Sequence, residues 1–204
     1  MRITHPLPVA LVVALSLYLL MLWIHDLRTA GRAEEEPGRL PGAVPCSGWA
    51  IYVAVLGALV LLGLETAGEY WLGSAAQQTD VTVIYLPLML AAAFTEELIF
   101  RGYIVITDRG RGPLIAGIIG ASLFFALLHP YLWRWTQGGL EFELGAGAML
   151  TTGAVFAKSV WFYVVRFFPL NPGRSLLPCI MAHLAANAGV FVIKGVQGHV
   201  VGWM

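Results

Sequence analysis

The sequence predicts an all-α membrane protein, a polytopic bundle of about six transmembrane helices. Of its 204 residues, 58% are hydrophobic and only 12% are charged, and the mean hydropathy is +0.76. A soluble domain carries roughly 25% charged and 45–50% apolar residues. The apolar residues also gather in six long segments, separated by polar or turn-rich connections. Composition and segmentation together indicate that most of the chain's surface is solvated by lipid.

Each of these segments approaches the roughly 20 predominantly apolar residues that a membrane-spanning helix needs. Helices are expected because backbone groups in lipid must form hydrogen bonds within their own segment. The first segment resembles a signal peptide, but no small-residue cleavage site follows it, so we interpret it as a mature helix. The predicted spans are residues 7–24, 48–64, 81–106, 113–129, 144–168 and 175–193.

The spans divide the chain into three predicted parts. Residues 1–80 contain two N-terminal helices joined by a long polar loop at 25–46, which we expect to be the most mobile connection. Residues 81–193 form a helical core, and residues 194–204 are a short tail. In the connection 130–143 the tryptophans are interpreted as interfacial anchors.

The distribution of Lys and Arg predicts that both termini lie outside the cytoplasm, because cytoplasmic connections are enriched in these residues. The connections after the first, third and fifth spans carry Arg28, Arg32, Arg39, Arg109, Arg111, Arg166 and Arg174. The opposite face carries Arg2, Arg134 and Lys194. The formal net charge is zero, so nothing indicates a nucleic-acid partner. Cys46 and Cys179 fit no metal-site or disulfide spacing and are predicted to be free thiols.

Three ionisable residues fall inside the third predicted span, where each costs about 2.5–3.5 kcal/mol on insertion scales. Glu97 and Arg101 are four residues apart, so they share a helix face and can neutralise each other. Glu96 points about 100° away from Glu97 around the helix and has no local partner. This pattern predicts that Glu97 and Arg101 hold structure while Glu96 faces a polar cavity. A buried ion-pair network without chemistry is the alternative.

The fourth and sixth spans add two histidines and an amide. His129 ends the fourth span, with Phe125 one turn earlier on the same face. His183 and Asn187 are four residues apart in the sixth span, among small residues that allow another helix to approach closely. His129 alone could be an interfacial residue, and the pair alone could be interhelical hydrogen-bonding groups. Together with Glu96 they form a plausible hydrolytic set: a base, a water-orienting group and oxyanion donors.

The order and spacing of these motifs resemble the CPBP family, which comprises CAAX proteases and bacteriocin-processing enzymes. The resemblance rests on Glu96-Glu97-x-x-x-Arg101, Phe125-x-x-x-His129 and His183-x-x-x-Asn187, within residues 81–193. It implies an intramembrane endopeptidase of the glutamic type and makes residues 81–193 its catalytic core. Glu96 and His129 would activate water, and His183 and Asn187 would stabilise the oxyanion. Glu97, Arg101 and Phe125 would support them.

The resemblance further implies that no cofactor is needed; in the less favoured zinc-dependent version Glu96, His129 and His183 would be the metal ligands. The expected partners are the lipid bilayer and a membrane-bound protein or peptide substrate, with a C-terminal anchor segment as one option. The expected location is the inner (cell) membrane of a bacterium. Six spans are fewer than eukaryotic prenyl proteases have, which leaves the CAAX substrate open. A non-catalytic immunity protein on the same scaffold and a proton-coupled transporter are the competing functions.

Charged residues outside these motifs receive structural interpretations. Glu65 and Glu69, beside the second span, are interpreted as a solvated helix end. Lys158 and Arg166 share a face of the fifth span and are expected to reach the interface or to pair with Glu141 or Glu143.

Overall fold

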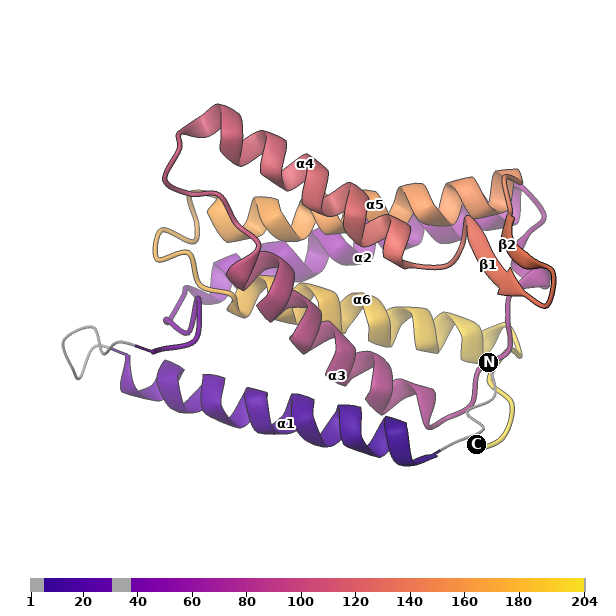
Figure 1. Ribbon diagram of the computed structural model, residues 1–204, viewed down its shortest axis with the longest axis horizontal. Helices are drawn as coiled ribbons and strands as arrows, with labels where there is room; N and C mark the ends of the chain where they lie inside the picture. The colour runs from indigo at the N-terminus through magenta and orange to yellow at the C-terminus, as the bar shows by residue number, and fades with distance from the viewer. Residues whose placement is uncertain (1–5, 31–37, 204) are drawn as a thin grey trace.

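Six α-helices form a single bundle in the computed structural model, which describes residues 6–30 and 38–203 (Figure 1). The helices are α1 (Pro6–Thr29), α2 (Gly48–Trp71), α3 (Tyr85–Glu97), α4 (Arg111–Leu128), α5 (Ala146–Phe167) and α6 (Leu177–Val196). A short 3₁₀ turn, η1 (Ala75–Gln77), lies between α2 and α3, and a π-helical segment, η2 (Leu98–Tyr103), continues α3. The predicted all-α bundle of about six helices is confirmed.

Successive helices cross the bundle in alternating directions, so α1 begins and α6 ends at the same end (Figure 1). All of them except α3 are long and apolar enough to cross a membrane. The third predicted span, residues 81–106, is shorter than expected, because its α-helix has 13 residues and then changes to the π-helical segment. The two carboxylates and the arginine of this span lie where the helix type changes.

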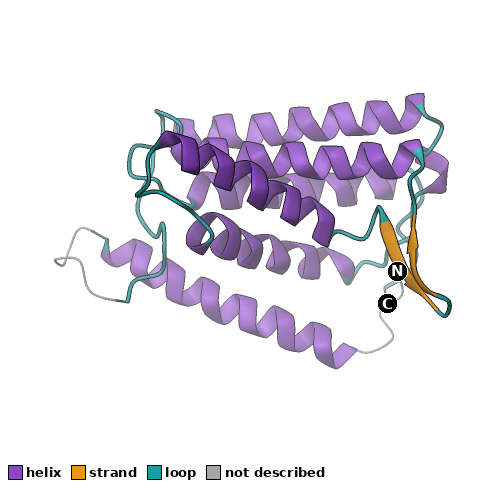
Figure 2. Ribbon diagram, turned by 45° about the horizontal axis from the view of Figure 1, so that its top comes forward, coloured by secondary structure: helices purple, strands orange, loops and turns teal. Residues whose placement is uncertain are grey.

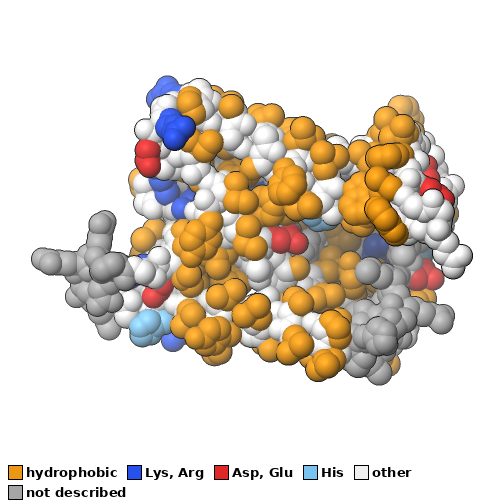
Figure 3. Space-filling view, in the orientation of Figure 1, with side chains coloured by type: hydrophobic (Ala, Val, Ile, Leu, Met, Phe, Trp, Pro, Cys, Tyr) orange, Lys and Arg blue, Asp and Glu red, His pale blue; other side chains and the backbone are white. Residues whose placement is uncertain are grey.

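The bundle is packed on small residues and coated with large apolar ones. Ala50, Ala54 and Ala58 are fully buried and recur every four residues along α2. By contrast, Leu7 and Leu11 on α1 are 69% and 61% exposed. Apolar side chains cover most of the face shown in Figure 3. Small residues that bring helix backbones together under an apolar coat are the arrangement expected of helices packed in lipid.

The predicted polar loop at 25–46 is more ordered than expected in the part that the structure describes. The Trp23 indole N–H donates to the carbonyl oxygen of Pro41 at 3.1 Å, and the backbone N–H of Leu40 donates to the Asp26 carboxylate at 2.8 Å. The backbone N–H of Leu176 donates to Gly42 O at 3.0 Å. These bonds attach the end of the loop to α1 and α6. Residues 31–37, which contain the acidic run of the predicted loop, lie outside the residues that the structure describes.

The connection 130–143 contains an antiparallel hairpin, β1 (Trp133–Thr136) and β2 (Gly139–Phe142), which the sequence analysis did not predict and which Figure 2 shows at one end of the bundle. Two interpretations of charged residues were wrong. Glu65 is buried rather than solvated, because its carboxylate pairs with the Lys158 ammonium at 2.7 Å between α2 and α5. Lys158 therefore does not pair with Glu141 or Glu143. Both cysteines are free, as predicted.

The closest approach of α2 to α5 depends on Gly57. A β-carbon at this position would lie 2.2 Å from Cζ2 of Trp161, whose indole N–H donates to Ala54 O at 2.9 Å. We predict that Gly57→Ala lowers the free energy of unfolding by about 1–3 kcal/mol, as overpacking usually does. Thermal unfolding in detergent micelles measures the change. Gly63→Ala on the same helix is the control, because its β-carbon meets nothing within 4 Å; equal loss in both variants would contradict this packing.

Candidate active site

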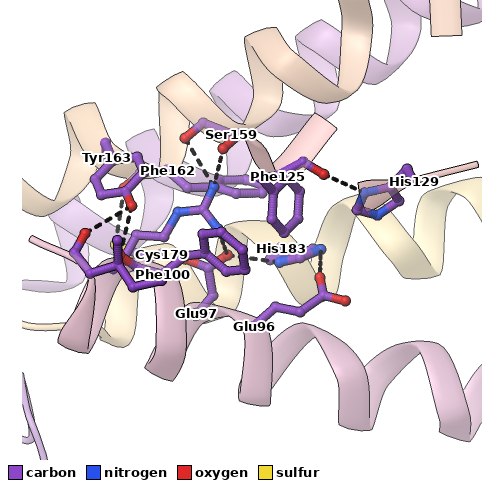
Figure 4. Close-up of polar contacts among 12 residues, drawn as sticks. Glu96, Glu97, Phe100, Phe125, His129, Ser159, Phe162, Tyr163, Cys179 and His183 are labelled. Atoms are coloured by element: carbon purple, nitrogen blue, oxygen red, sulfur yellow. Dashed lines mark hydrogen bonds and ion pairs between the residues drawn. The ribbon is translucent and has the colours of Figure 1, made fainter. Parts of the chain in front are cut away.

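The site is organised around a carboxylate that has no access to solvent. Glu97, at the end of α3, is fully buried, and its Oε1 accepts hydrogen bonds from Arg101 Nη1 at 3.1 Å and from His183 Nδ1 at 2.8 Å. Figure 4 shows Glu97 on α3 beside the His183 ring, with the hydrogen bond between them. The predicted Glu97–Arg101 pair is thus present, and it extends to α6 through His183.

Arg101 is held by a cage that the sequence did not predict. Its Nη2 donates to Ser159 Oγ at 2.5 Å and to Ser159 O at 3.1 Å. The guanidinium carbon lies 4.8 Å from the ring centroids of both Phe125 and Tyr163 and 5.3 Å from that of Phe162. Hydrogen bonds and aromatic faces replace the water that a fully buried guanidinium has lost. Arg101 therefore fixes α3 against α4 and α5.

The π-helical segment presents backbone carbonyl groups to the same cage. The Tyr163 hydroxyl donates to Phe100 O at 2.6 Å and also lies 3.2 Å from Ile104 O. A π-turn widens the helix, leaves carbonyls out of the regular ladder and often occurs at functional sites. Tyr163 satisfies the Phe100 carbonyl of this segment and lies near the carbonyl of the residue that follows it, so it holds the segment that carries Arg101.

Glu96 differs from Glu97 both in its exposure and in its hydrogen bonding. Its side chain is 32% exposed, whereas that of Glu97 is 0% exposed. Glu96 Oε2 lies 3.7 Å from His183 Nε2, which is too long for a direct hydrogen bond. Figure 3 shows an acidic side chain beside a histidine at the edge of a hollow in the middle of this face. A carboxylate that reaches such a hollow can contact a substrate or a water molecule.

His183 is fixed from both faces of its ring. It stacks on Phe162 with ring centroids 4.9 Å apart and meets Phe125 edge-on at 6.1 Å. Its Nδ1 must donate to Glu97, because a carboxylate paired with arginine is ionised and only accepts. Its Nε2 therefore points toward Glu96 in an orientation set by Glu97.

His129 and Asn187 lie at the margins of the cluster. His129 Nδ1 lies 2.8 Å from Phe125 O and must donate to this carbonyl, which leaves Nε2 with its lone pair. The His129 ring is 4.8 Å from Phe125, which also touches His183. Asn187, one turn beyond His183 on α6, donates to Met89 O on α3 at 3.0 Å. The structure therefore brings Glu96, Glu97, Arg101, Phe125 and His183 together, with no direct contact between Glu96 and His129.

The loop that follows His129 borders the site. Tyr131 stacks nearly parallel to the His129 ring at 6.1 Å. Desolvation raises the pKa of Tyr131 to about 12, and the neighbouring Tyr85 and the carboxylates Glu65, Glu69 and Glu96 add to this effect. The phenol therefore keeps its proton at all physiological pH values and remains a hydrogen-bond donor near Glu96.

A comparison with protein families identifies the family of this chain. The family model described as type II CAAX prenyl endopeptidase Rce1-like matches residues 78–189, more than half of the chain. The chain belongs to this family. The matched segment of the endopeptidase family runs from the loop before α3 into α6 and includes both carboxylates, both histidines and Asn187. No curated protein and no solved structure matches the chain.

Membership in the endopeptidase family fits the predicted CPBP resemblance and makes the chain a protease-family membrane protein. α1 and α2 lie outside the matched segment, yet α1 contributes a bond to it: Ser16 Oγ and Thr95 Oγ1 are 2.8 Å apart. Ser159 and Tyr163 were missed by the sequence analysis, because a serine and a tyrosine in an apolar helix follow no recognisable motif. Their partners come from a segment about 60 residues away in the chain.

The buried network makes a prediction about stability. Glu97→Gln removes the charge that faces both Arg101 and His183, so it should lower the free energy of unfolding by about 3–5 kcal/mol, as breaking a buried pair does. Glu96→Gln should change it little, because Glu96 is partly exposed and has no close hydrogen bond. Unfolding in mixed detergent micelles compares the two isosteric variants. Equal destabilisation by both would contradict the division between a structural and a free carboxylate.

Proposed function

We propose that the protein is an intramembrane endopeptidase in which Glu96 activates a water molecule to hydrolyse a peptide bond of a membrane-associated protein. The observation that carries the proposal is the contrast between the two adjacent glutamates. Glu97 is buried and bonded twice, whereas Glu96 is 32% exposed and forms no hydrogen bond with the residues that the structure describes. A buried ion-pair network without chemistry would not require a second carboxylate beside it, at the cost of placing it in the membrane.

Glu96 and His129 are proposed to hold the attacking water. Because His129 donates through Nδ1 to Phe125 O, its Nε2 can accept one hydrogen bond from the water. The Glu96 carboxylate accepts the other and takes the proton as the oxygen attacks the scissile carbonyl carbon. Glu96 then gives this proton to the leaving amine when the C–N bond breaks, so the carboxylate is regenerated.

His183 and Asn187 are proposed to stabilise the oxyanion. With His183 donating through Nδ1 to Glu97, a second proton on Nε2 makes the cluster of Glu96, Glu97, Arg101 and His183 electrically neutral. Neutrality is favoured where the surroundings cannot solvate a net charge. The Nε2–H then faces the position where the oxyanion forms. Asn187 can contribute its second amide hydrogen, and one such donor accounts for about 2.7–4 kcal/mol of transition-state stabilisation.

Metal independence is part of the proposal. A zinc version would need Glu96, His129 and His183 as three ligands around an open position. Within residues 6–30 and 38–203 no three His, Cys, Asp or Glu side chains converge as one metal ion requires. In the metal-free version Glu96 and Asn187 also have roles, and the hydrogen bonds of His129, His183 and Asn187 already orient these three side chains. This consideration favours glutamate-activated water.

The proposed substrate is a membrane-bound protein or peptide, with a C-terminal anchor segment as one possibility and a prenylated CAAX terminus as the class that the family description names.

The proposed location is a bacterial inner membrane. α4 ends at the hairpin and begins at the arginine-containing turn, so these lie at opposite ends of the bundle (Figure 1). With the arginine-rich end in the cytoplasm, the hairpin end lies outside it.

The role of Glu96 is tested by cleavage of internally quenched peptides in proteoliposomes. The two probes are a farnesylated peptide with a CAAX terminus and the same peptide without the farnesyl group. We predict that Glu96→Gln lowers kcat by about 10²–10⁴-fold, the usual contribution of a general base. Equal cleavage by wild type and Glu96→Gln, or no cleavage of either probe by wild type, contradicts the proposal.

Two controls complete this assay. Glu143→Gln makes the same isosteric change at an exposed position near the hairpin and should leave kcat unchanged. Treatment of wild type with a chelator should also leave it unchanged. Loss of activity with chelator, restored by zinc, would instead make Glu96, His129 and His183 metal ligands.

A further inference from the structure

The hairpin beside the site has one apolar and one polar face. Residues paired across an antiparallel ladder share a face, and the register pairs Trp133 with Phe142 and Trp135 with Leu140. These four side chains form the apolar face. The alternate pair, Arg134 and Glu141, forms an exposed ion pair at 3.1 Å on the other face. A two-stranded sheet of this kind presents a continuous apolar surface beside the candidate site.

β1 is attached to the end of α4 that carries His129. The Trp133 indole N–H donates to Leu127 O in the last turn of α4 at 2.8 Å. Tyr131, between His129 and β1, stacks on the His129 ring. In Figure 1, β1 lies on the side of the hairpin toward the middle of the bundle, and β2 lies on the other side. Figure 3 shows the hollow of this face extending to the hairpin. The edge of β1 that faces away from β2 therefore borders the hollow.

That edge carries backbone groups without a strand partner. Hydrogen-bonded and non-hydrogen-bonded residue pairs alternate along an antiparallel ladder. The bond from Glu143 N–H to Leu132 O, at 2.9 Å, shows that the pair before Trp133 and Phe142 is a hydrogen-bonded one. Trp133 and Trp135 then occupy non-hydrogen-bonded positions, so their N–H and C=O groups point away from β2. The sheet contains β1 and β2 alone in the part of the chain that the structure describes. The β1 edge thus offers two donors and two acceptors, spaced two residues apart.

We propose that the β1 edge binds the substrate as a third, extended strand that leads the scissile bond to Glu96; this proposal rests on the proposed function. A helical peptide keeps its carbonyls in hydrogen bonds, so it must become extended before water can attack one of them. An extended chain in an apolar environment exposes N–H and C=O groups that need partners. Adding a strand to a free sheet edge supplies these partners, and alternate substrate side chains then contact the apolar face.

The test measures binding of the two fluorescently labelled probe peptides to Glu96→Gln protein, which separates docking from cleavage. Trp135→Pro removes an outward N–H from the β1 edge without removing a ladder bond, and Leu140→Pro does the same at the opposite edge of β2. Each proline variant is compared with an alanine variant at the same position, so that the effect of losing the native side chain is common to both and cancels in the comparison. We expect Trp135→Pro to weaken binding at least fivefold relative to Trp135→Ala, and Leu140→Pro to match Leu140→Ala within twofold.

A second measurement leaves the protein unchanged. N-methylation of the probe at successive residues should weaken binding at every second position, because only alternate N–H groups face the β1 edge. Absence of binding, absence of this period of two, or equal effects of the two prolines would overturn the docking proposal; equal effects would fit a hairpin that only anchors in the bilayer. Failure of the proposed function is seen separately, as unchanged cleavage by the Glu96→Gln protein.

Discussion

The ion pair between Glu97 and Arg101 is the interaction on which the rest of the site depends. Both side chains are fully buried in a bundle whose exterior is apolar, so neither can recover its lost hydration from water. The protein replaces that hydration with hydrogen bonds to Ser159 and His183 and with aromatic ring faces. These replacements come from α4, α5 and α6. Satisfying one buried charge pair therefore fixes the relative positions of α3, α4, α5 and α6.

The position of the reactive groups follows from this constraint. Adjacent residues on a helix point about 100° apart, so one glutamate can be committed to the interior while its neighbour reaches the surface. Glu97 also fixes the orientation of the His183 ring by accepting from Nδ1, and thereby aims Nε2 toward Glu96. Phe125 plays a comparable part on the other side, because its ring covers Arg101 and its carbonyl orients His129. The supporting residues thus determine the chemistry available to Glu96.

The sequence was sufficient to predict features that depend on local spacing. Apolar segment lengths predicted the helices, and the four-residue spacing from Glu97 to Arg101 predicted their pair. The π-helical segment could not be predicted, because its Phe100 carbonyl is satisfied by Tyr163 from α5. The burial of Glu65 was missed for the same reason, since Lys158 is 93 residues away. The hairpin was missed because each strand has only four residues, too few for a clear alternation.

The central claim is that the buried Glu97 fixes the protonation of His183 and so prepares its Nε2 to face the reacting groups. Nitrogen-15 NMR of histidine-labelled protein in bilayers at neutral pH, with the His183 signal assigned by its loss in His183→Gln, reports the proton on each ring nitrogen directly. The account predicts that Nδ1 carries a proton and that Nε2 is protonated as well, with the second proton lost in Glu97→Gln. A His183 ring whose Nδ1 is unprotonated in the wild-type protein would contradict it.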